Sequence, residues 1–107
     1  MVGHRMSLAD MHAATFKAQL QTLFAVRHQP PTSLVLADVA EPDAPPSGME
    51  LFALYFRGPA TEFIGQGTHP LAHPELGDFD LFLVPVGRDG DEIVYEAAFH
   101  RLIRRGQ

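Results

Sequence analysis

The pattern of hydrophobic and polar positions is clearest between residues 79 and 100. Residues 81–86 (LFLVPV) are apolar at odd and even positions alike, as in a strand that is covered on both faces. Residues 92–99 (EIVYEAAF) alternate instead, which is typical of a strand with one buried face. Because residues 87–91 (GRDGD) have the chemistry of a turn, the two segments are predicted to form an antiparallel hairpin.

Four more segments have strand character, and residues 50–57 (ELFALYFR) are again apolar on both parities. The other three cover residues 22–28, 33–40 and 68–73, with Gly and Pro between them. Short strands at this spacing predict a mainly β fold, a small antiparallel barrel or sandwich of five to six strands. The side chains predicted to be largely buried are Phe52, Leu54, Phe56, Leu81, Leu83, Val84, Ile93, Tyr95 and Phe99.

One N-terminal helix is predicted over residues 8–19, packed on the sheet. Ser7 is a good N-cap, and Asp10 takes the place of the usual Glu in a capping box. Apolar residues follow at helical spacing and would form its buried stripe: Leu8, Met11, Phe16 and Leu20.

A chain of 107 residues is long enough for one modest core and too short for two. The predicted organisation is a disordered extension at 1–6, a single β domain at 7–100 and a basic tail at 101–107. The chain contains no cysteine, which excludes disulfides, thiolate zinc sites and cysteine nucleophiles. Together with an N-terminus that lacks the apolar core of a signal peptide, this favours a cytoplasmic location.

The net charge of −5 is unevenly distributed. Residues 33–96 carry twelve carboxylates against Arg57 and Arg88, whereas residues 97–107 carry three arginines and no acid. A nucleic-acid site needs clustered Lys and Arg on the folded surface, so this acidic body predicts that nucleic acid is not a partner. No apolar run approaches the length that spans a bilayer, so no membrane association is expected.

Several ordered motifs resemble one known family: FALYFRGP at 52–59, QGT at 66–68, HPELG at 73–77, LFLVPVG at 81–87 and YEAAF at 95–99. With these motifs, residues 6–100 resemble a family of small bacterial proteins catalogued as domain of unknown function 6916. The chain departs from the family pattern at His69-Pro70 and at His100. The resemblance implies a neighbouring phage-tail-collar-like fibre protein as partner, and it brings no catalytic residues and no cofactor.

The candidate metal ligands are His69, His73, Asp78 and Asp80. The two histidines would lie on one face of a strand but about 13 Å apart, and a metal site needs three or four groups to converge. The favoured explanation is that both histidines are polar strand-edge residues, each in front of a proline that limits edge pairing. No serine is predicted to lie on a nucleophile elbow, so no catalytic residue is assigned.

Two strands with apolar residues on both parities exceed what one small core can bury, which predicts an interface. The predicted interface residues are Leu51, Tyr55, Phe82, Val84 and Val86. The leading hypothesis is therefore a non-catalytic assembly or binding module, an accessory of a phage-tail-like or surface fibre, acting through a protein partner or as a homodimer. The alternative is a small metal-dependent hydrolase that uses the four candidate ligands.

Overall fold

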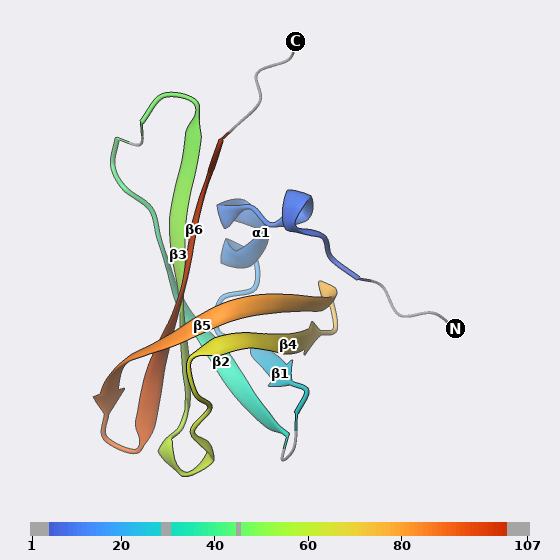
Figure 1. Ribbon diagram of the computed structural model, residues 1–107, viewed down its shortest axis with the longest axis vertical. Coiled ribbons are helices and arrows are strands. Elements are labelled where there is room, and N and C mark those ends of the chain that lie inside the picture. Colours follow the sequence, from blue (N-terminus) through green and yellow to red (C-terminus); the bar gives the residue numbers. More distant parts are fainter. Residues whose placement is uncertain (1–4, 29–30, 45, 103–107) are drawn as a thin grey trace.

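A computed structural model describes residues 5–28, 31–44 and 46–102, which form one sheet of six antiparallel strands (Figure 1). The strands are β1 (Leu23–Val26), β2 (Thr32–Ala40), β3 (Met49–Pro59), β4 (Gly67–His73), β5 (Gly77–Asp89) and β6 (Glu92–Leu102). Their spatial order is β1-β2-β3-β6-β5-β4, and β4 returns to β1 through two residue pairs, Ala25 with Ala72 and Val26 with Leu71. The mainly β prediction is therefore confirmed, and the strands make one sheet rather than the two of a sandwich.

The hairpin predicted in residues 79–100 is formed by β5 and β6. Its turn is tight, with Asp89 paired to Glu92 and Gly90 in the left-handed region at φ 61°. The register shifts between Pro85 and Gly87, where proline lacks the N–H that a regular ladder requires. This irregularity lies within the sheet, because β5 has β6 and β4 as neighbours and is not an edge strand.

The core lies on the inner face of the coiled sheet. Along β3, buried Phe52, Leu54 and Phe56 alternate with half-buried residues, as the two-residue period of a strand requires. Six of the nine predicted core residues are buried, and Val84, Ile93 and Phe99 are half-buried. Val84 differs because it pairs with Glu96 and shares that residue's outer face.

The prediction of a helix over residues 8–19 is wrong. The segment forms a 3-10 turn, η1 (Leu8–Asp10), and a five-residue helix, α1 (Ala13–Lys17). Met11 and His12 between them are extended, with ψ of 97° and 159°. The break lets Met11, Ala13 and Phe16 enter the core, whereas Leu8 and Leu20 of the expected stripe are exposed.

Helix α1 lies beside the sheet (Figure 1), and its Phe16 is fully buried. Its ring centroid lies 6.0–6.3 Å from the rings of Phe52, Phe79 and Phe99, which come from three different strands. Aromatic contacts at this distance add to the hydrophobic gain from burial. One short turn therefore closes an end of the core that a longer helix was expected to cover.

Both chain ends extend the fold beyond the predicted domain of residues 7–100. Residues 1–4 of the predicted extension and 103–107 of the predicted tail lie outside the described residues. Arg5 forms a parallel bridge to Asp78, and the buried Met6 donates its N–H to the Asp78 carbonyl oxygen, 2.8 Å away. At the other end, Arg101 belongs to β6.

Candidate functional site

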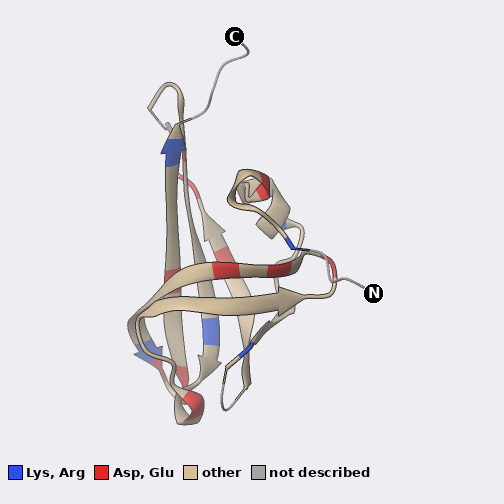
Figure 2. Cartoon of the chain, turned by 45° about the vertical axis from the view of Figure 1, so that its right-hand side comes forward, with Lys and Arg blue, Asp and Glu red and all other residues tan. Residues whose placement is uncertain are grey.

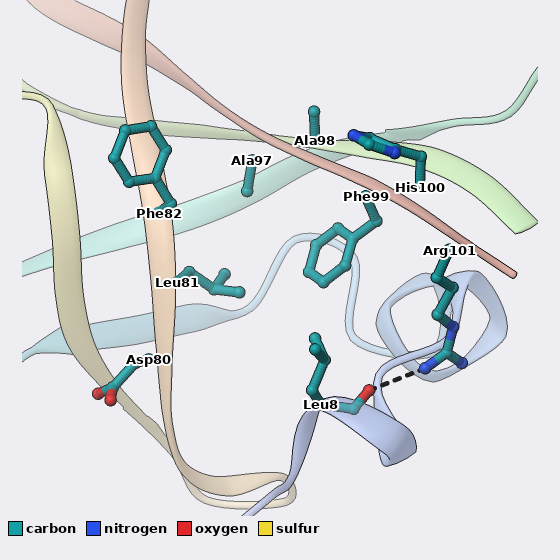
Figure 3. Close-up of a pocket in the computed structure, with 9 residues that line it drawn as sticks. All are labelled: Leu8, Asp80, Leu81, Phe82, Ala97, Ala98, Phe99, His100 and Arg101. Carbon is teal, nitrogen blue, oxygen red and sulfur yellow. Dashed lines mark hydrogen bonds between the residues drawn. The ribbon is translucent and has the colours of Figure 1, made fainter.

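Strands β5 and β6 separate part-way along their length. Their pairing runs from Asp89–Glu92 to Val84–Glu96 and stops there. Beyond that point β5 pairs with β4, and β6 continues along β3 as far as Leu102. The space between the diverging halves is the β5–β6 cleft (Figure 3).

The cleft is a mainly apolar cavity of about 260 Å³. In Figure 3, Leu81 of β5 and Phe99 of β6 point into the space between the strands, and Leu8 of η1 points toward them from the opposite side. The other residues that line the cleft are Asp80, Phe82, Ala97, Ala98, His100 and Arg101. Inner-face and outer-face residues both take part, so the cleft is an opening in the sheet rather than a hollow on one face.

A polar cluster of His12, Glu50 and Arg101 holds the N-terminal segment beside this cleft. Glu50 Oε1 accepts from His12 Nδ1 and Arg101 Nε, each 3.1 Å away, and its Oε2 accepts from the Ala13 N–H at 3.3 Å. Arg101 also donates from Nη1 to the Leu8 carbonyl oxygen at 2.9 Å (Figure 3). Burial alone would raise the pKa of Glu50, but the three hydrogen bonds outweigh it and lower that pKa.

The five predicted interface residues lie on β3 and β5, the two strands that flank β6, and we call the outer surface of these three strands the β3–β6–β5 face. Register sets Tyr55 beside Glu96 and Glu96 beside Val84, so these three residues make one row across the face. Leu51 lies farther along β3, opposite His100. Leu51, Tyr55 and Val84 are half-buried, whereas Phe82 and Val86 are 53% and 51% exposed.

The side chains of the central row are held in place by a hydrogen bond. The Tyr55 hydroxyl donates to Glu96 Oε2 at 2.6 Å. This bond, with burial and the nearby charges of Glu96 and Asp38, raises the pKa of Tyr55. Tyr55 therefore presents a fixed aromatic surface rather than a mobile side chain.

The four candidate metal ligands are not brought together. Register pairs His69 with the buried Leu81, so His69 and His73 lie on the inner face of β4. Asp78 and Asp80 pair with Ala72 and Pro70 and lie on the outer face. Within residues 5–28, 31–44 and 46–102 there is no group of three or more potential metal ligands. The four candidate ligands therefore do not form one site in the described part of the chain.

Each candidate ligand instead has a partner in the fold. The ion pairs are Asp80 with Arg5 at 2.9 Å and Asp78 with Arg27 at 3.7 Å, and His69 Nε2 donates to the Gly65 carbonyl oxygen at 2.7 Å. These contacts give the four side chains structural explanations.

His73 is buried and its ring nitrogens are both hydrogen-bonded. Nδ1 accepts from the N–H groups of Glu75 and Leu76 at 3.0 and 3.3 Å, and Nε2 donates to the Thr22 hydroxyl at 2.9 Å. Burial lowers the pKa of His73, although the charge of Glu75 acts in the opposite direction. Neutral His73 therefore fixes the turn after β4.

Comparison with known protein families gives one match, which covers most of the chain. The model of a family described as a domain of unknown function (DUF6916) matches residues 11–99. The chain belongs to this family. The matched range holds the whole β3–β6–β5 face but not Leu8 or Arg101. No curated protein and no solved structure matches the chain.

Among the described residues, no helix has the length and apolar character needed to cross a membrane.

Sequence reasoning missed the cleft and the polar cluster beside it. Arg101 was assigned to the basic tail, but its contact with Glu50 spans 51 positions in the chain and its contact with Leu8 spans 93. The available signal was the absence of Gly or Pro in residues 100–102, so that nothing in the sequence ends the strand at Phe99.

Proposed function

We propose that this chain is a non-catalytic binding module that joins a protein partner through the β3–β6–β5 face. The observation that supports the proposal is that the outer sides of β3 and β5, which flank β6, carry apolar residues, and that two of these, Phe82 and Val86, are about half exposed. Exposed apolar side chains that are grouped, rather than scattered singly, mark interaction surfaces.

The rigidity of this face supports the proposal. Strands β3 and β6 pair without interruption over eleven residue pairs, from Met49–Leu102 to Pro59–Glu92. A preformed surface spends little free energy on ordering when it binds. Aromatic side chains such as Tyr55 and Phe82 are also the residue types enriched among those that dominate binding energy.

The partner that we propose is a tail-collar-like fibre protein, and this identity rests on the family resemblance alone. A homodimer through the same face is the second version, because a single apolar face can be self-complementary about a two-fold axis. The chemistry of the face is the same in both versions.

Co-expression tests the proposal. The tagged chain is produced with the product of each gene that lies beside its own, including any tail-collar-like fibre gene, and the complexes are quantified by size-exclusion chromatography with light scattering. We expect a stoichiometric complex with one of these products, or a dimer of the chain itself. Only the monomer in every mixture would overturn the proposal.

Matched variants show whether the face is responsible. Val86→Glu places a charge at an exposed position of the face, and we expect it to abolish the complex. Leu23→Glu is the control, because Leu23 is 60% exposed on β1, which β2 and β4 separate from the face. Equal loss of binding in both variants, or in neither, would contradict the assignment of the face.

A further inference from the structure

We infer that the partner presents an extended peptide segment that pairs with the open edge of β6 and places an apolar side chain in the β5–β6 cleft. This inference rests on the proposed function and names how the partner is held. It commits to a peptide rather than to a small molecule or a second folded surface.

The open edge supplies the backbone contacts. Residues 97–102 of β6 pair with β3 on one side, and in the described part of the chain no strand pairs with their other side. Alternate N–H and C=O groups of such an edge point outward and accept an added strand. Six residues span about 20 Å, which is enough for a short peptide.

The chain itself shows that strand addition is feasible at this cleft. On the opposite wall, Arg5 forms a parallel bridge to Asp78 of β5, and Met6 donates its N–H to the Asp78 carbonyl oxygen. Two residues farther along, Leu8 points into the cleft (Figure 3). An N-terminal segment thus combines edge pairing on β5 with an apolar side chain in the cavity. The opposite wall of the cleft, formed by residues 97–102 of β6, remains available to a segment of the partner.

The size of the cavity favours a side chain over a small molecule. Small-molecule sites usually enclose about 300–1,000 Å³ and include a few convergent polar groups. This cavity has a volume of about 260 Å³, and the inner-face residues that line it from β5 and β6 include Leu81, Ala97 and Phe99. That volume suits one large apolar side chain, with orientation supplied by backbone pairing outside the cavity.

The charged residues around the cleft indicate which residues of the bound peptide flank its apolar side chain. Glu96 lies where the two strands separate, and acidic residues continue along β5 (Figure 2). Of these, Asp78 and Asp80 are already ion-paired with Arg27 and Arg5. The guanidinium of Arg101, at the far end, is engaged by Glu50 and the Leu8 carbonyl oxygen. Residues 33–96 carry a net charge of −10. A peptide with Lys or Arg beside its anchor is therefore complementary to Glu96 and to the acidic body of the chain.

The test uses the full chain and a display library of linear dodecapeptides of random sequence. Enriched peptides are synthesised, and their affinity is measured by fluorescence anisotropy. We expect a shared pattern of one large apolar residue flanked by Lys or Arg, and slower hydrogen exchange of the amides in residues 97–102 when the peptide is bound.

Matched leucine variants locate the peptide. Leu8→Trp fills the cavity from a side chain that is 64% exposed, and we expect it to weaken binding by at least about tenfold. Leu23→Trp, at a similarly exposed leucine outside the cleft, leaves affinity unchanged, and Leu8→Ala retains binding because it leaves the cavity open.

Equal binding to the Leu8→Trp and wild-type chains overturns the inference, as does protection outside residues 97–102 or the absence of any enriched peptide. If the Val86→Glu variant still disrupts the partner complex in that case, the proposed function stands and only the peptide mode fails. If neither set of variants affects binding, both fail.

Discussion

Phe52 and Phe99 stack across β3 and β6 with ring centroids 4.5 Å apart and planes 9° from parallel. The two rings form a directly opposed cross-strand pair, and both contact the Phe16 ring of α1. The half-buried Phe99 also lines the β5–β6 cleft. One aromatic group therefore links the N-terminal turn, the core and the candidate site.

Phe52→Ala should remove the centre of this group. Truncation of a buried Phe typically costs about 3–5 kcal/mol, and for a domain of this size each kcal/mol lowers Tm by about 4–8 °C. We expect Tm to fall by more than about 10 °C in a thermal melt followed by circular dichroism. Phe63→Ala, at a ring that is 57% exposed, should cost less than about 1 kcal/mol. Equal Tm values for the two variants would contradict the central position of Phe52 in the core.

Gly58→Ala should destabilise the chain through a clash in the core. A Cβ at this position of β3 would clash with Leu34 Cδ2, and Leu34 is itself buried and cannot move aside freely. Overpacking of this kind costs about 1–3 kcal/mol. Gly87→Ala is the control, because a Cβ there would have no heavy atom within 4 Å. Urea unfolding of both variants checks the prediction, which fails if Gly58→Ala is as stable as Gly87→Ala.

Glu50 should make the fold sensitive to acid. Its pKa is lower in the folded chain than its ordinary value of 4.5, so it stabilises the fold fully above that pH. That stability is lost as pH falls below 4.5 and through the lowered pKa of the folded state. Glu50→Gln should lower the free energy of unfolding at pH 7 by about 1–2 kcal/mol and reduce the further loss toward pH 3. Urea unfolding at both pH values tests this, with Asp43→Asn in an exposed loop as control.

His73 should add a second transition at higher pH. Its pKa is lowered by burial from an ordinary value of 6.5, so below pH 6.5 the unfolded chain takes up a proton that folded His73 resists. The free energy of unfolding therefore falls as pH decreases from about 7.5 toward the lowered pKa. In His73→Gln this part of the slope should disappear, whereas the exposed control His100→Gln should keep it. An unchanged slope in His73→Gln would assign the transition to another histidine.

Local pattern was sufficient to predict the strands. The alternation of residues 92–99 and the turn residues 87–91 identified the β5–β6 hairpin, because hairpins are specified by residues close in sequence. The two-sided strands identified the outer face, since apolar residues on the second parity of β3 and β5 have to lie there. Such patterns lie within single strands, and the strands that they predicted are present in the structure.

The N-terminal segment and the cleft depend on long-range contacts. Helical spacing of Leu8, Met11 and Phe16 is also satisfied by two short turns, and the contact of the Ala13 N–H with Glu50 favours the broken form. Likewise, the cleft exists because β5 takes β4 as its neighbour and β6 takes β3, which no local pattern specifies. For the same reason the four candidate metal ligands seemed close in sequence, yet two face inward and two outward.

Hydroxyl-radical footprinting of the chain, free and in its complex, tests the central claim most directly because it reports the solvent exposure of individual side chains. The account predicts that binding protects Phe82 and Val86 of the β3–β6–β5 face and leaves Leu23 and Phe63, which are similarly exposed elsewhere, unchanged. Protection of Leu23 or Phe63 with unchanged labelling of Phe82 and Val86 would contradict it.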